Sequence, residues 1–308
     1  MTIQQLEYIL AVDKFRHFAK AAEYCLVTQP TLSAMIQKLE EELGVQIFDR
    51  SVQPVCPTAI GEKILAQARI VQQEAGHVKE IVKEEQKSVS GIFRLAILPT
   101  IAPYLLPRFY PTFMEHYPEL DISVTEMKTQ NAKESLLKGE SDAAIIASIP
   151  EEASLQKDVL FYEEFLGYVS RKEPLFKKDL IRTSAITGER LWLLDEGHCF
   201  RDQLVKFCQL ENVKDNQRAY HLGSIETFMR MVEGGKGITF IPQLAFYQLS
   251  EQQKELVRPF AIPHPTRQIV LVTNKSFVRY SLLRILKEAI QASVPKEMLS
   301  LQAVQYLV

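Results

Sequence analysis

Residues 59–87 carry the pattern of one long amphipathic helix, and this stretch constrains the fold more than any other. Its apolar positions are spaced four, three, four, three and four residues apart, and they are Ile64, Ala68, Val71, Ala75, Val78 and Val82. This spacing is typical of a coiled-coil seam. Because the sequence offers the seam no partner helix, it predicts a dimer helix that pairs with a second copy of the chain. The alternative is a helix packed on its own domain.

Three short helices are predicted before this long one. The second, at about 18–24, contains small alanines that permit close packing, and the third runs from about Gln29 to Leu43. Thr28 is placed to cap the third helix, Pro30 suits its first turn because a missing N–H costs little there, and Gly44 ends it. Residues 45–57 are predicted to form a hairpin wing.

The third helix has the surface that a DNA-recognition helix needs. Short polar side chains at the start of a helix after a tight turn suit the major groove. The candidate DNA-contacting residues are Gln29, Pro30, Thr31, Ser33, Gln37 and Lys38, with Arg50 in the wing as a phosphate contact. The acidic run at 40–42 is expected at the far end of the helix, away from phosphates.

Charge is an objection to DNA binding by this unit. Residues 1–58 contain five Lys and Arg against seven Asp and Glu, a balance of 5 − 7 = −2, and DNA-binding units are usually basic. From the pattern alone, DNA binding and a small helical bundle with another role remain equal alternatives.

The chain after Gly91 alternates between strand and helix patterns. Strands are predicted at 93–98, 122–127, 143–147, 165–170, 191–194, 238–241 and 269–273, with helices between them, such as 132–138, 224–233 and 280–292. This alternation predicts an α/β fold. Residues 88–91 are predicted to be a hinge after the long helix, and the tail at 293–308 has no assigned role.

Two of the four cysteines, Cys199 and Cys208, lie nine residues apart where a predicted strand is followed by a predicted helix. Cys199 would stand at a helix N-terminus, where backbone N–H groups and positive charge from Arg201 and a protonated His198 favour a thiolate. If both cysteines lay on one helix, their Cα atoms would be ~13 Å apart. A disulfide needs the two Cα atoms to lie within ~7 Å of each other. A redox pair therefore requires the helix to melt. The alternative is that both are small buried apolar residues.

Composition restricts the class of protein further. The net charge of −2 does not indicate nucleic-acid or membrane binding by bulk charge, and no apolar run approaches the ~18 residues of a membrane span. The N-terminus lacks the pattern of a signal peptide, so a cytoplasmic protein with reduced cysteines is expected. No cysteine or histidine spacing indicates a metal, and no glycine-rich phosphate loop indicates a nucleotide cofactor, so neither is predicted.

The N-terminal residues resemble those of a known family. The run A-A-E-Y-C-L-V-T-Q-P-T-L-S-A-M-I-Q-K-L-E-E-E-L-G-V-Q-I-F-D-R, followed by P-T-A-I-G, is similar to the winged helix-turn-helix of LysR-type transcriptional regulators. The resemblance implies an all-α winged helix-turn-helix at 1–58, a linker and dimerisation helix with a hinge at 59–90, and a two-lobed α/β effector domain of periplasmic-binding-protein type at 91–308. Lobe I would comprise 91–162 and 268–308, and lobe II 163–267.

The run G-H-C-F-R-D-Q and the later Cys208 resemble the peroxide-sensing members of that family. The resemblance implies that Cys199 reacts with hydrogen peroxide and that Cys208 resolves the product into a reversible disulfide. It also implies a set of residues that bind or activate peroxide: Thr100, Thr129, His198, Asp202 and Arg267. Without the resemblance, Thr100 and Thr129 would be interpreted as helix caps or turn residues, and Arg267 as a charged surface residue.

The implied protein is a regulator of oxidative-stress genes and not an enzyme. Its partners would be operator DNA, hydrogen peroxide, further copies of the chain in a homodimer or homotetramer, RNA polymerase and a cellular thiol reductant. The alternatives are a LysR-type regulator with a small-molecule effector between its lobes, and a thiol peroxidase. The wing differs from that of the family at Gln53, Cys56 and Pro57, and these differences put its phosphate contacts in doubt. The resemblance assigns no redox role to Cys25 or Cys56.

Overall fold

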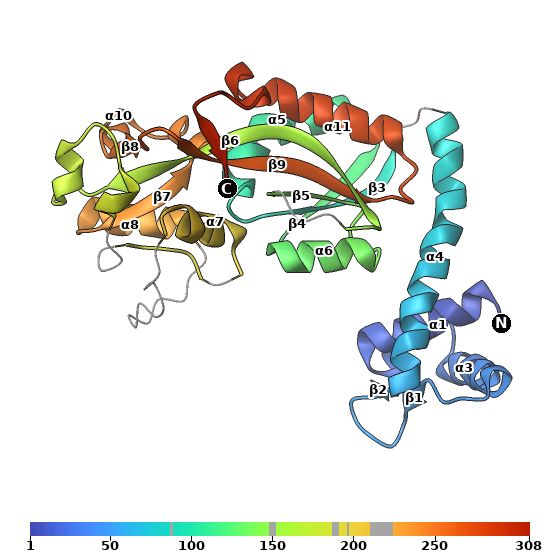
Figure 1. The fold of residues 1–308 in the computed structure, drawn as a ribbon. Helices are drawn as coiled ribbons and strands as arrows, with labels where there is room; N and C mark the ends of the chain where they lie inside the picture. The colour runs from blue at the N-terminus through green and yellow to red at the C-terminus, as the bar shows by residue number, and fades with distance from the viewer. Residues whose placement is uncertain (87–88, 148–151, 187–190, 196, 210–223) are drawn as a thin grey trace. The chain divides into compact units, whose positions relative to one another are not determined.

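The computed structural model describes residues 1–86, 89–147, 152–186, 191–195, 197–209 and 224–308. The chain divides into two compact units, Met1–Gln86 and Lys87–Val308 (Figure 1). Among the described residues, no helix is both long enough and apolar enough to cross a membrane.

The first unit contains the three short helices and the hairpin that the sequence predicts. The helices are α1 (Ile3–Phe15), α2 (Phe18–Tyr24) and α3 (Gln29–Leu43), and the hairpin pairs β1 (Phe48–Asp49) with β2 (Cys56–Pro57). The Thr28 hydroxyl accepts the N–H of Thr31, and Gly44 ends α3 in the left-handed conformation, as predicted. Leu32, Ile36 and Leu39 on α3 are fully buried in the core of this unit.

The long helix is α4 (Ala59–Glu85). Thr58 caps it by accepting the N–H of Gly61, and its hydroxyl donates to the carbonyl of Gln46 in the turn before the wing. Gly61 is required by this close approach, because a Cβ there would lie only 2.0 Å from the carbonyl oxygen of Ile47. The wing and the start of α4 are therefore fixed to each other.

The apolar seam of α4 has two different environments. Ala68 is buried in the core of the first unit, and Ile64 and Val71 pack against that core. By contrast, Val78 and Val82 have 64% and 53% of their surfaces exposed. The alternative that α4 packs on its own domain therefore holds for the N-terminal half of the seam, whereas Val78 and Val82 leave the C-terminal half of the seam available to a second chain.

The second unit is built on a mixed sheet in the order β4-β3-β5-β9-β6-β7. Its strands are β3 (Gly91–Ile97), β4 (Leu120–Glu126), β5 (Ala143–Ala147), β6 (Leu155–Val169), β7 (Ile238–Pro242) and β9 (His264–Asn274), with β8 (Val257–Pro259) on β6 and β10 (Gln305–Leu307) on β9. The long strand β6 pairs with β9 as far as Glu164 and with β7 and β8 from Phe165 onward.

Helices cover both faces of this sheet, which confirms the α/β prediction (Figure 1). They are α5 (Ala102–His116), α6 (Thr129–Leu137), α7 (Cys199–Phe207), α8 (Ile225–Gly234), α9 (Gln243–Phe246), α10 (Glu251–Lys254) and α11 (Tyr280–Ser293), with short 3-10 turns η1 (Pro174–Lys177), η2 (Thr183–Ala185) and η4 (Lys296–Leu299). In Figure 1, α5 and α11 lie on one face of the sheet and α6 on the other.

Two elements differ from the sequence expectations. The pattern at 191–194 predicts a strand, but Leu191 forms only a single bridge to Ile238. Helix α5 is not among the helices named from the sequence, and it contains Pro107 and Pro111. The side-chain amide of Gln248 donates to the carbonyl of Pro103, which would otherwise have accepted the N–H that Pro107 lacks. The hinge prediction at 88–91 begins at a residue outside the described ranges.

Candidate functional site

The predicted DNA-contacting residues share one open face of the first unit. On α3, Gln29, Pro30, Thr31, Gln37 and Lys38 are exposed and Ser33 is half-buried. The opposite face of the helix lies in the core. Side chains at the N-terminal end of such a helix are placed to reach base edges in a groove.

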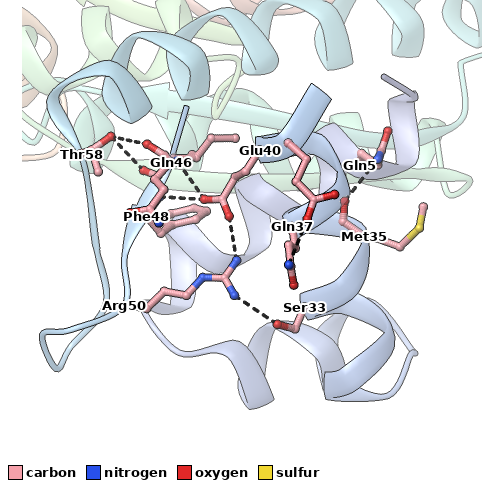
Figure 2. A network of polar contacts seen from close by, with 11 residues as sticks. Gln5, Ser33, Met35, Gln37, Glu40, Gln46, Phe48, Arg50 and Thr58 are labelled. Atoms are coloured by element: carbon pink, nitrogen blue, oxygen red, sulfur yellow. Dashed lines mark hydrogen bonds and ion pairs between the residues drawn. The ribbon is translucent and has the colours of Figure 1, made fainter. Parts of the chain in front are cut away.

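Arg50 in the wing lies beside this face and belongs to a polar network that Figure 2 shows. Its guanidinium donates to the carboxylate of Glu40 at 2.8 Å and to the hydroxyl of Ser33 at 3.4 Å. It also stands over the ring of Phe18, with Cζ 5.1 Å from the ring centroid. The side chain of Arg50 is nevertheless 40% exposed, so one surface of the guanidinium remains open to a phosphate.

Glu40 is the centre of the network (Figure 2). It is buried, and its second carboxylate oxygen accepts the backbone N–H groups of Ile47 and Phe48 at 2.7 and 3.3 Å. One carboxylate on α3 therefore holds both the entry of the wing and its arginine. The acidic run at 40–42 was expected at the far end of α3, away from phosphates, but Glu40 turns inward and pairs with Arg50, the predicted phosphate contact.

Cys199 is the first residue of α7 and Cys208 follows its last turn. This agrees with the predicted helix N-terminus. Cys199 is half-buried, Cys208 is buried, and all four cysteines of the chain are free thiols. Burial raises the pKa of the Cys208 thiol to about 12. With nine residues of helical rise between them, ~13 Å separates the two positions along α7, so no disulfide forms while α7 is intact.

Arg267 lies in the interior of the second unit and is not a surface charge. The side chain is 1% exposed. Its Nε and Nη2 donate to one oxygen of Glu163 at 2.9 and 2.7 Å, Nη1 donates to the Thr100 hydroxyl at 3.0 Å, and Nη2 also donates to the Thr100 carbonyl at 2.9 Å. Glu163 is 2% exposed and lies directly opposite Arg267 in the β6–β9 pairing.

Aromatic rings join this buried arginine to the cysteine helix. The guanidinium carbon lies 5.0 Å from the ring centroid of Phe200 and 5.8 Å from that of Phe165. Phe200 follows Cys199 in α7, and the two rings pack 4.7 Å apart. The structure thus brings Arg267 and Thr100, which the resemblance selects, to the N-terminal end of α7.

Thr129 reaches the same region from another element. It begins α6, directly after Lys128. A Cβ at Gly197 would lie 3.6 Å from Cδ of Lys128, so the start of α6 abuts the residues before Cys199. Among the described residues, the buried Thr129 hydroxyl oxygen has no hydrogen-bond partner. A buried hydroxyl without a partner is costly in a folded protein unless a ligand or water satisfies it.

His198 and Asp202 have less central places. His198 is buried at the N-cap of α7, and burial together with the Lys128 ammonium lowers its pKa, despite the opposite influence of Asp195 and Asp202. His198 is therefore neutral at neutral pH, and the positive charge expected of it does not apply there. Asp202 is exposed in the first turn of α7 and acts on His198 through its charge.

Three contributors to this site were missed in the sequence. Glu163 stands in the run Tyr162–Glu164 with nothing local to distinguish it, and it meets its partner 104 positions later in the chain. Phe200 is an apolar residue at the start of a helical pattern, and nothing near it in the sequence marks it as a partner of Arg267. Lys128 had one signal in the sequence, since it directly precedes the predicted site residue Thr129. Within the described part of the chain, no group of three or more His, Cys, Asp or Glu could hold a metal ion.

The C-terminal tail, which had no predicted role, packs on the cysteine helix. Strand β10 runs parallel to the start of β9, in register with His264–Thr266. The side-chain amide of Gln203 in α7 donates to the carbonyl of Val308 at 2.9 Å. The ring of Phe207 lies 6.1 Å from that of Tyr306. The tail therefore connects α7 to the strand that carries Arg267.

Comparisons with known proteins cover almost the whole chain. Residues 3–62 match the model of the bacterial regulatory helix-turn-helix protein, lysR family, and residues 86–295 match that of the LysR substrate binding domain. A "Hydrogen peroxide-inducible genes activator" of Haemophilus influenzae is 35% identical over 272 residues, 88% of this chain and 90% of the relative.

Two solved structures are similar in both sequence and fold. OxyR from Porphyromonas gingivalis is 54% identical, covers 71% of this chain and 99% of its own, and gives a TM-score of 0.67. A full-length OxyR variant from Pseudomonas aeruginosa is 33% identical, covers 96% of this chain and 99% of its own, and gives a TM-score of 0.79.

Proposed function

Because this chain belongs to the LysR family of bacterial transcription regulators, we propose that it is an OxyR-like regulator that senses hydrogen peroxide. The activators and OxyR structures that it resembles make peroxide the first effector to test. The observation that carries the proposal is the pair of threonine hydroxyls near the start of α7 that can still hydrogen-bond a ligand. The buried hydroxyl of Thr129 has no hydrogen-bond partner among the described residues, and the Thr100 hydroxyl accepts from Arg267, which leaves its own proton for a ligand.

This set suits a small neutral molecule with two oxygens. Each oxygen of hydrogen peroxide can both donate and accept a hydrogen bond, as can each threonine hydroxyl. Cys199 lies at the N-terminus of α7, where backbone N–H groups favour negative charge on the sulfur. The sulfur would attack one peroxide oxygen, the O–O bond would break, and the leaving hydroxide would take up a proton to form water. Cys199 would then be a sulfenic acid.

The second step needs a change of structure. Cys208 is buried, and its pKa is raised to about 12, so in the intact fold it is a thiol that cannot reach Cys199. Opening of α7 would free it to attack the sulfenic sulfur and form the Cys199–Cys208 disulfide with release of water. The same opening would break the contacts of Gln203 and Phe207 with the C-terminal tail. Oxidation would thereby switch the second unit between two packings.

The other partners follow from this mechanism. The polar face of α3 and Arg50 would bind operator DNA, and a thiol reductant of the cell would restore the cysteines in a cytoplasmic setting. The two lobes keep the proposed limits of 91–162 with 268–308, and 163–267. RNA polymerase would be the partner through which an activator of this kind acts.

Intact-protein mass spectrometry tests the proposed function. After one equivalent of hydrogen peroxide, we expect the loss of two hydrogen masses, localised by proteolysis to the peptide with Cys199 and Cys208. The footprint of the oxidised protein on an operator should differ from that of the reduced protein. If the wild-type chain is not oxidised at this peptide, peroxide sensing is excluded, and a LysR-type regulator with another small effector remains.

The exposed half of α4 gives a prediction about assembly. We expect a double V78E/V82E variant to be monomeric, because two charges would replace the apolar face that a second copy would bury, and to lose half-site recognition. Sedimentation velocity measures the mass. Lys63→Glu is the matched control, since it adds negative charge to an exposed position of the same helix outside the seam. A V78E/V82E variant that sediments like wild type would remove α4 as the dimer contact.

A further inference from the structure

We propose that Glu163 determines which ligands can bind beside Cys199, between Thr100 and Thr129 (here called the Cys199 pocket), by orienting Arg267 and cancelling its positive charge. This inference deepens the proposed function and rests on it. Glu163 touches no reacting atom and is therefore a positioning and specificity-determining residue. The pocket would in consequence admit an uncharged peroxide and disfavour the small anions that an unpaired arginine would attract.

The geometry of the pair is the first support. Glu163 and Arg267 are cross-strand neighbours in the antiparallel β6–β9 ladder, so the backbone itself sets their separation. One carboxylate oxygen receives both Nε and Nη2 of the arginine. The other oxygen accepts the backbone N–H of Leu244 at the start of α9, at 3.0 Å. The carboxylate is thus held from two sides, and it fixes the plane of the guanidinium.

The orientation of Arg267 leaves one of its three nitrogens, Nη1, directed toward the Cys199 pocket. With Nε and Nη2 committed to Glu163 and to the Thr100 carbonyl, Nη1 faces the Thr100 hydroxyl. Guanidinium presents its donors in a rigid fork, so fixing two nitrogens fixes the third. Arg267 therefore acts through Nη1, as an oriented hydrogen-bond donor.

The burial of both charges is the second support. With side chains 1% and 2% exposed, neither charge is screened by water, and an unpaired guanidinium here would be strongly disfavoured. The rings of Phe165 and Phe200 pack together against the guanidinium, with their centroids 5.8 and 5.0 Å from its central carbon. Glu163 is the only carboxylate to which an ion pair joins Arg267 among the described residues, so the neutrality of this part of the pocket depends on it.

The test compares two alkylating agents of similar size at Cys199, the anion iodoacetate and the neutral iodoacetamide. Peptide mass spectrometry at constant ionic strength gives the rate of each, and their ratio reports the charge that Cys199 experiences. We expect E163Q to raise the iodoacetate-to-iodoacetamide ratio roughly tenfold, because the buried positive charge of Arg267 would no longer be cancelled by a carboxylate. E163D keeps the charge and should stay within about twofold of wild type, since the Coulomb term is unchanged.

A doubly neutral variant, E163Q/R267Q, keeps the test decisive if E163Q does not fold. Its ratio should equal that of wild type, because the pair contributes no net charge in either protein. A wild-type ratio roughly tenfold above that of the double variant would overturn the proposal, as would a folded E163Q with an unchanged ratio.

Orientation has a separate readout in the rate of sulfenic-acid formation with hydrogen peroxide. E163D should slow this step roughly tenfold, because the shorter side chain draws Nη1 away from the pocket, while its iodoacetamide rate stays that of wild type. An E163D variant as fast as wild type with peroxide would overturn the positioning role. If wild type itself forms no sulfenic acid, the proposed function fails, whereas the alkylation ratio still decides the role of Glu163 in charge.

Discussion

Replacing Cys199 with serine should abolish the reaction with stoichiometric hydrogen peroxide and all change in DNA footprint. A serine hydroxyl keeps the shape of the site but is neither ionised at neutral pH nor oxidised by peroxide. The expected effect is complete, because no other cysteine lies at the start of α7. Intact-protein mass measures the first effect and an operator footprint the second.

Cys208→Ser is the informative counterpart to this variant. The first step should proceed at its normal rate, because Cys208 is buried at the C-terminal end of α7, opposite to Cys199, and has no role in binding peroxide. The sulfenic acid should then accumulate, or oxidise further to the sulfinic acid. A sulfenic-acid trap that labels Cys208→Ser but not Cys199→Ser is the expected result. Equal labelling of both variants would move the reactive sulfur to Cys25 or Cys56.

The contrast between these variants rests on the stability of α7. In the reduced chain this helix is supported by Phe200 and Leu204 in the core and by the contacts of Gln203 and Phe207 with the tail. A disulfide between its two ends would require the helix to open. In the proposed mechanism, oxidation would exchange the packing of one nine-residue helix for one covalent bond, and the second unit would change between two states.

Local features of the fold were predictable from the sequence. Thr28, Pro30 and Gly44 mark the limits of α3, and Thr58 marks the start of α4, because caps and helix ends act over three or four residues. The break at Gly197 and the helix after it likewise placed Cys199 at a helix N-terminus. Strands with a regular pattern, such as those at 143–147 and 238–241, were also found.

Features set by distant parts of the chain were not predictable in this way. Arg267 looks like a surface charge in sequence and is buried because Glu163 faces it on a neighbouring strand. Glu40 looks like part of a solvated acidic run and is buried because the wing turns two backbone N–H groups and Arg50 toward it. In both cases the decisive partner is fixed by tertiary pairing. The two threonines gained their place only through the family resemblance.

Arg50→Ala should weaken binding to every DNA sequence, by roughly 10–100-fold, and lower the slope of log affinity against log salt by about one. Two losses combine in this variant. One phosphate contact disappears, and the carboxylate of Glu40 is left without its cation, which adds negative charge beside the DNA. The measurement is a salt titration of affinity on operator and non-operator duplexes. Lys38→Ala, which removes an exposed basic residue of α3 and leaves the Glu40 network intact, should lower the slope similarly but reduce affinity less.

A double variant, E40Q/R50A, separates the two losses. Neutralising Glu40 removes the unpaired buried charge, so the melting temperature of the first unit, lowered in Arg50→Ala, should return toward wild type. The affinity for DNA should recover only in part, because the phosphate contact stays absent. Full recovery of affinity in E40Q/R50A would mean that Arg50 only holds the wing through Glu40 and touches no phosphate. An Arg50→Ala variant that binds duplex as tightly as wild type across the titration would reject the wing as a DNA contact altogether.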